Sequence, residues 1–190
     1  MGVYSAIDNR AVKTLSAVAQ EFEAGIPIRT CAEGKVMFGG EKLGVQHLTA
    51  SYKVISKWMG RVYVYTWQFF LVDVSFPSNA LITLKYSGKI GGRKSARFVS
   101  KSADVKHIIE KLNQDKKIKE ICERIDFETI HIKYIEEKQS WCVEMRPNYG
   151  DFIWILLPPV FYSRRPNKKE VESTIQLIGQ LSKYLGNASV

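Results

Sequence analysis

Hydrophobic positions recur at helical spacing near both ends of the chain. Apolar residues three or four apart over residues 7–22 form one stripe, which predicts an amphipathic helix over residues 6–24. The same spacing over residues 171–185 predicts a last helix. Asn167 is placed to cap that helix, with Glu170 completing a capping box. Each end of the chain is therefore expected to be a helix with one buried face.

Two further apolar stripes occupy the middle of the chain. One runs through residues 105–112 and the other through residues 118–125. At ~100° per residue, the two stripes fall on nearly opposite sides of a single helix. Because one straight helix could not bury both against one sheet, we predict two helices with a break at residues 113–115, or a sharp kink near Asn113. Asp115 is placed to cap the second helix.

Between the first and second helices, the hydrophobic period shortens to that of a β-strand. Residues 47–58 alternate between apolar and polar, which predicts a half-buried strand. Residues 62–76 are apolar on both faces at their start, which predicts a central strand. Residues 80–87 and 94–100 flank a glycine-rich turn and predict a hairpin. Sequential strands joined by short turns usually pair, so we expect an antiparallel meander.

Strand patterns return before the last helix. Residues 128–135 and 140–145 predict a hairpin, and the continuous apolar run 152–157 predicts a buried strand. The predicted order is α-β(4-5)-α-α-β-β-β-α. This order defines an α+β fold in which an antiparallel β-sheet, a meander plus C-terminal strands, is covered by helices.

Length and composition agree with one globular domain over residues 1–190, 45% hydrophobic and 25% charged. The apolar runs 62–76 and 152–162 fall short of the ~20 residues that a spanning helix needs, so we expect no membrane insertion. Three widely spaced cysteines form neither a disulfide nor a zinc pattern. With no signal-peptide pattern at the amino terminus, we expect a cytoplasmic protein with reduced thiols.

Positive charge is concentrated in the first half of the chain. Residues 1–100 carry 13 Lys and Arg against 6 Asp and Glu, whereas residues 101–190 carry 15 against 13. Residues 74–103 contain no acidic residue and form a predicted basic hairpin. Its candidate binding residues are Lys85, Lys89, Arg93, Lys94, Arg97 and Lys101. They could grip phosphates or an acidic protein surface, or they could only keep an exposed edge hairpin from pairing with other strands.

The turn of this hairpin invites comparison with a phosphate-binding loop. Residues 88–95 approach the pattern GxxxxGK[ST], but Arg93 stands where the second glycine is required. The residues that follow predict a strand, so the helix amino terminus that such a loop uses to hold phosphate is not expected here. The sequence therefore predicts no nucleotide cofactor.

A proline-rich loop over residues 158–166 is the second candidate binding segment. Its restricted backbone carries residues of the types that anchor protein interfaces, namely Phe161, Tyr162, Arg164 and Arg165. The alternative is that its apolar residues only cover the open end of the core beneath the last helix.

Catalysis and metal binding have little support in the sequence. His47, His107 and His131 form no closely spaced histidine pair of the kind that binds metals. His131 and Cys142 could face each other across the hairpin of residues 128–145, which is the geometry of an activated thiol. A chance cross-strand pair is the simpler interpretation, so we expect neither a catalytic site nor a metal site.

These patterns favour a non-enzymatic binding or adaptor domain that contacts an anionic partner or an acidic protein surface through its basic hairpin. Nucleic acid is a weaker expectation, since Tyr86 and Phe98 are the aromatic residues available and both are predicted to point inward. A carrier of a small apolar ligand is one alternative, with aromatic walls from Tyr63, Tyr65, Trp67 and Phe69. A cysteine-dependent enzyme is the other.

Overall fold

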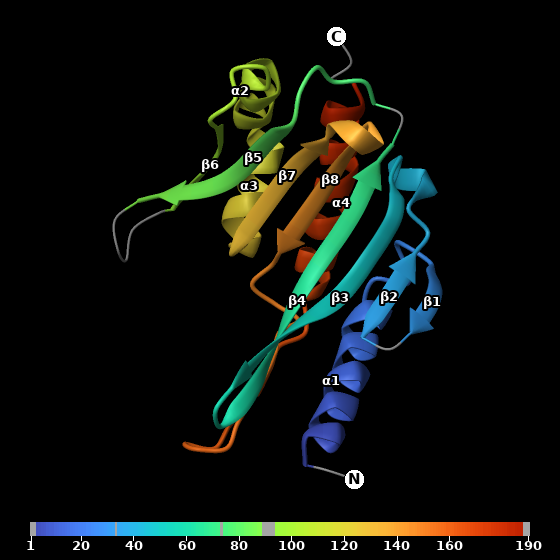
Figure 1. Ribbon diagram of the computed structural model, residues 1–190, viewed down its shortest axis with the longest axis vertical. Coiled ribbons are helices and arrows are strands. Elements are labelled where there is room, and N and C mark those ends of the chain that lie inside the picture. The colour runs from blue at the N-terminus through green and yellow to red at the C-terminus, as the bar shows by residue number, and fades with distance from the viewer. Residues whose placement is uncertain (1–2, 33, 73, 89–93, 188–190) are drawn as a thin grey trace.

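The computed structural model describes residues 3–32, 34–72, 74–88 and 94–187. Within them, ten strands hydrogen-bond into one antiparallel sheet, and four α-helices accompany it. Figure 1 shows helices α3 and α4 behind the sheet, so that one face of the sheet carries the helices and the other is open. The chain is therefore an α+β protein with an antiparallel sheet, as the sequence predicts.

The four helices match the apolar stripes of the sequence. They are α1 (Val3–Gln20), α2 (Lys106–Gln114), α3 (Lys116–Ile125) and α4 (Lys168–Gly186). The predicted capping box begins α4, because Asn167 Oδ1 accepts from Glu170 N at 3.0 Å and Glu170 Oε2 accepts from Asn167 N at 2.8 Å. Among the described residues, no helix combines the length and the apolar character that crossing a membrane requires.

The predicted break between α2 and α3 is confirmed, and Asp115 makes it. Asp115 Oδ1 accepts hydrogen bonds from the amides of Lys117 and Ile118, at 2.8 and 3.0 Å. Its second oxygen accepts from the Tyr184 hydroxyl of α4 at 2.8 Å. Asp115 therefore caps α3 and fastens the helix pair to α4.

The strands are more numerous than predicted, with six before α2 and four after α3. They are β1 (Ile28–Ala32), β2 (Lys35–Phe38), β3 (Gln46–Lys57), β4 (Gly60–Leu71), β5 (Ala80–Ser87), β6 (Ser95–Ser100), β7 (Thr129–Ile135), β8 (Ser140–Arg146), β9 (Phe152–Ile155) and β10 (Val160–Ser163). The additional strands β1 and β2 fall in the glycine-containing segment after α1, and β10 falls in the predicted proline-rich loop.

The order across the sheet is β1-β2-β3-β4-β8-β7-β5-β6, which differs from a simple meander beyond β4. The chain after β4 crosses the turn between β7 and β8 instead of turning back beside β4. Val74 N donates to Gln139 O in that turn at 3.2 Å. The buried Tyr134 hydroxyl donates to Val74 O and accepts from Phe76 N, at 2.8 and 3.1 Å. These bonds direct β5 to the far side of β7.

The long strands β3 and β4 extend past the end of β8, and their projecting ends form a second, smaller region of the sheet. Beyond β8, β4 pairs with β9, and β9 pairs with β10. We call residues 52–64 together with residues 152–163 the arm. Its inner side packs on α1 in a small apolar cluster of its own, made of Ile7, Ala11, Tyr63 and Phe152. The main core lies between the rest of the sheet and the helices.

Candidate functional site: a basic groove along β6

The β5–β6 hairpin sets two predicted cations side by side. Lys85 pairs with Arg97 across the two strands, and Leu84 pairs with Phe98. Leu84 and Phe98 are buried, whereas Lys85 and Arg97 are exposed. Strand alternation therefore turns both cations away from the core, as the sequence predicts.

Two of the predicted binding residues, Lys89 and Arg93, lie outside the described residues, as does the turn that contains them. Description of the chain resumes at Lys94, and strand β6 begins at Ser95. The segment compared with a phosphate-binding loop is therefore followed directly by a strand. Since that loop chemistry depends on a helix amino terminus, the comparison has no structural support.

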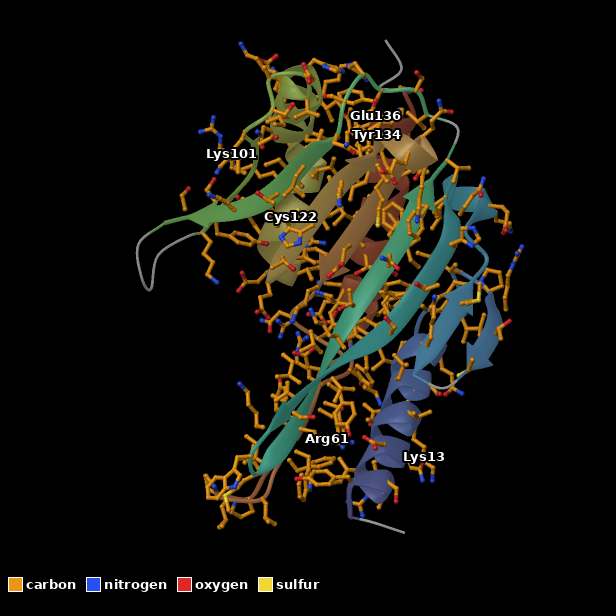
Figure 2. The ribbon with its side chains drawn as sticks, in the orientation of Figure 1. Lys13, Arg61, Lys101, Cys122, Tyr134 and Glu136 are labelled. Carbon is orange, nitrogen blue, oxygen red and sulfur yellow. The ribbon has the colours of Figure 1, made fainter. Side chains whose placement is uncertain are left out.

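A groove runs along the outer edge of β6, between this strand and helices α2 and α3. It has two parts of about 830 and 400 Å³, which share Ser95 and Lys119. We call the two parts together the β6 groove. Its charged lining residues are Lys94, Arg97, Lys101, Lys106, Lys116, Lys119, Glu110, Glu120 and Glu123. Six cations thus line the groove against three carboxylates, and Figure 2 shows one of them, Lys101, beside α2.

The backbone of β6 along the groove is already hydrogen-bonded by helix side chains. Asn113 Oδ1 accepts from Phe98 N at 2.8 Å, and Asn113 Nδ2 donates to Phe98 O at 2.9 Å. Glu123 Oε1 accepts from Ala96 N at 3.3 Å. Asn113 therefore pairs with β6 as a neighbouring strand would. A strand of a partner protein could pair with this edge of β6 only by displacing the Asn113 side chain. Recognition of a partner in the groove therefore depends on side chains.

One groove cation is partly neutralised within the chain. Lys94 Nζ lies 2.6 Å from Asp126 Oδ2 and 5.8 Å from the centre of the Tyr86 ring. Tyr86 is itself half-buried, and its hydroxyl donates to Cys122 O at 2.8 Å. Burial raises the pKa of Tyr86, so this ring stays neutral and acts as a support for Lys94.

The second predicted binding segment lies in a different part of the molecule. Phe161 and Tyr162 are exposed residues of β10 in the arm. Arg164 donates to Asn148 O at 2.8 Å and forms an ion pair with Glu170 of α4, and Arg165 lies 3.6 Å from Glu21. The structure therefore does not bring this segment together with the basic hairpin. Arg164 instead stabilises the start of α4 through its ion pair with Glu170.

The aromatic residues proposed as walls of a ligand cavity are packed into the protein. Tyr65, Trp67 and Phe69 are fully buried, and Trp67 contacts Phe22 edge to face with ring centres 4.8 Å apart. Tyr63 lines an open hollow beside α1. Three of the four rings therefore form core rather than the wall of a binding site.

The structure does not place the two residues considered for thiol catalysis directly opposite each other. His131 pairs with Glu144, and Cys142 pairs with Lys133. Burial raises the pKa of the Cys142 thiol, which is the opposite of activation. Within the described part of the chain, no three His, Cys, Asp or Glu side chains gather as a metal site would require.

Sequence reasoning missed the three groove cations contributed by helices, Lys106, Lys116 and Lys119. They lie in the second half of the chain, where acidic and basic residues nearly balance, so total charge gave no signal. Lys116 and Lys119 are three residues apart in α3 and share one face of it, which is the pattern that could have identified them.

Fold and groove together define the chain as an α+β protein with a largely open antiparallel sheet and a basic groove at the sheet edge. The chain belongs to the family described as "Protein of unknown function (DUF3156)", which it matches over residues 20–185. No curated protein and no solved structure matches it.

Proposed function

We propose that this protein is a non-enzymatic binding or adaptor domain that holds an acidic polypeptide segment of a partner protein in the β6 groove. The observation that carries the proposal is the composition of the groove lining, in which six cations from β6, the residues that flank it, α2 and α3 outnumber three carboxylates. Cations on a concave surface reinforce one another's field and attract an extended anionic chain. The proposal includes a cytoplasmic location, which the three free cysteines support.

The groove chemistry favours carboxylates over nucleic acid. Single-stranded nucleic acids are held by aromatic rings on which bases stack, in addition to cations along the backbone. Phe98 is the aromatic residue among those that line the groove, and it is 2% exposed. Tyr86, on the neighbouring strand, is held by its hydrogen bond to Cys122. Nucleic-acid bases would therefore find few aromatic rings to stack on in the groove, whereas the carboxylates of an acidic peptide can bind through the cations alone.

Charge reversal in the groove tests the proposal. The variant Arg97→Glu, Lys101→Glu, Lys119→Glu leaves the Lys94–Asp126 ion pair intact. Binding of a fluorescently labelled oligoglutamate peptide is measured by anisotropy at low and at physiological salt. We expect the variant to bind about tenfold more weakly or worse, since three attractive contacts of several tenths of a kcal/mol each become repulsive.

A control variant with the same change in net charge is Lys13→Glu, Lys42→Glu, Lys168→Glu, which reverses exposed lysines outside the groove. It should weaken binding by no more than about threefold, because exposed charges beyond the screening length contribute little. Equal loss in both variants would show that only net charge matters and would overturn the groove assignment. Tighter groove-dependent binding of an oligothymidylate than of the peptide would assign the groove to nucleic acid instead.

A further inference from the structure

Exposed apolar side chains are concentrated on the arm. In the described part of the chain, eleven large hydrophobic residues are exposed, and eight of them belong to the arm. These eight are Val54, Ile55, Trp58, Leu156, Leu157, Val160, Phe161 and Tyr162. A patch of this kind on a protein surface marks an interaction site with an apolar partner.

Three of these residues, Trp58, Leu156 and Leu157, lie on two turns that sit side by side at the end of the arm. Trp58, between β3 and β4, is 90% exposed, and Leu157, between β9 and β10, is 61% exposed. Leu156 N donates to Met59 O at 2.8 Å and joins the two turns. In Figure 1 these turns lie at the end of the molecule away from α2, which they share with the start of α1, and they project beyond the rest of the sheet. We call these two turns, residues 58–59 and 156–159, the tip.

The arm is held firmly against α1, so the tip has a defined position. Asp8 of α1 accepts from Arg61 Nη1 and from the Tyr63 hydroxyl. The Arg61 guanidinium lies 4.4 Å from the centre of the Tyr4 ring, and Tyr4 contacts Trp154 edge to face. These contacts set the position of the arm, and with it the two turns, against α1.

The charge of the arm has one sign. Residues 52–64 and 152–163 contain no Asp or Glu. Lys57 is exposed beside the β3–β4 turn and Lys53 is exposed four residues earlier in β3, while Arg61 forms an ion pair with Asp8. Exposed aromatic and aliphatic side chains beside lysines are the combination that binds the surface of an anionic bilayer, with the apolar groups below the headgroups and the lysines among them.

We propose that the two turns of the arm dock this protein on the surface of an anionic lipid bilayer. The turn between β9 and β10 contains Pro158 and Pro159, which have no amide hydrogen to leave unsatisfied among acyl chains. Docking of this kind inserts side chains into one leaflet at the membrane surface, and it does not require a membrane-spanning helix. A second copy of the chain fits this tip less well, because both copies carry a net charge of +9.

Vesicle binding tests this proposal with a built-in spectroscopic probe. Of the four tryptophans, Trp67 and Trp141 are fully buried and Trp154 is half-buried, so Trp58 is the one that reports on solvent at the tip. With vesicles of equal parts phosphatidylglycerol and phosphatidylcholine, the protein should co-sediment and its tryptophan emission should shift to the blue. Trp58→Phe should keep the co-sedimentation and lose most of the shift.

Removing the apolar tip should abolish docking without disturbing the fold. Trp58→Ser, Leu157→Ser should lower the partition coefficient at least about tenfold, and Lys53→Gln, Lys57→Gln should lower it by about fivefold for each lysine. The matched control is Met37→Ser, Leu81→Ser, which removes two exposed apolar residues elsewhere on the surface. It should bind vesicles as the unchanged protein does.

Three results would overturn the proposal. The first is no binding of the unchanged protein to anionic vesicles, and the second is equal binding by the tip variant and the control variant. The third is a stable dimer in light scattering that Trp58→Ser, Leu157→Ser dissociates, since the tip would then be covered by a second copy. Reversal of Arg97, Lys101 and Lys119 should leave the tip-dependent blue shift in place, so failure of the groove proposal and failure of this one are separable.

Discussion

Asn113→Ala removes the side chain that closes the outer edge of β6. Asn113 makes two hydrogen bonds to the Phe98 backbone, at 2.8 and 2.9 Å, in a partly buried setting. A neutral hydrogen bond contributes about 0.5–1.5 kcal/mol net, so the loss of both should lower the free energy of unfolding by about 1–3 kcal/mol. With a urea m-value of about 2–3 kcal/mol/M, the midpoint should fall by roughly 0.3–1.5 M.

Hydrogen exchange locates the effect at a single amide. Phe98 N–H faces Asn113, so its exchange should accelerate in the variant, while the Ala96 amide, which donates to Glu123, should change little. Gln114→Ala, at an exposed position next in the same helix, is the control and should leave both measurements unchanged. An unaltered Phe98 exchange rate together with a stability change below about 0.5 kcal/mol would refute the edge-closing role.

Two further substitutions test how the arm and the chain after β8 are held in place. Gly150→Ala should lower the free energy of unfolding by about 3 kcal/mol or more. A Cβ at this position would lie 2.5 Å from Tyr65 Cγ, and the backbone φ of +88° is strained for any residue with a side chain. Urea unfolding of the variant at wild-type stability would contradict this. Hydrogen bonds from Arg61 and Tyr63 lower the pKa of Asp8, so its contribution to stability is present above the ordinary carboxyl pKa of about 4 and is lost as pH falls through the lowered value. Asp8→Asn should therefore be less stable than wild type at neutral pH, with a difference that shrinks in acid; a difference independent of pH would exclude this role.

Local patterns predicted the helices well because each is decided by residues near one another in the chain. The opposed stripes over residues 105–112 and 118–125 required a break, and Asp115 supplies it by capping α3 and binding Tyr184. The capping box of Asn167 and Glu170 is likewise visible in four consecutive residues. Such interactions leave a spacing signature that the sequence shows directly.

The order of the strands depends on contacts that leave no such signature. No local pattern in β4 predicts its pairing with β8, because that pairing depends on the contact of Val74 with Gln139 in the turn between β7 and β8. The proline-rich composition of residues 158–166 predicts a loop, where the structure has the exposed strand β10. It exists because Phe152–Ile155 offers a partner edge, which is a tertiary effect.

The same distinction applies to the candidate site. The hairpin cations were predictable from an interval without acidic residues, and Lys85 and Arg97 point outward as strand alternation requires. The groove was not predictable, because it forms only where β6 meets α2 and α3 and collects Lys106 and Lys119 from segments that look neutral in sequence. Charge composition therefore predicts the cations of the hairpin, while the groove that adds the helix cations depends on the fold.

The two proposed surfaces occupy opposite ends of the molecule, with the β6 groove beside α2 and the apolar turns at the far end of the arm (Figure 1). Both are basic, so an anionic bilayer attracts both, and charge alone does not orient the protein. Only the arm adds exposed apolar side chains, and burial of apolar surface is not screened by salt. Raising the ionic strength should therefore remove peptide binding in the groove before it removes vesicle binding by the arm. If both were lost together as salt increases, the apolar turns would contribute nothing, and the arm would act only as another cluster of lysines.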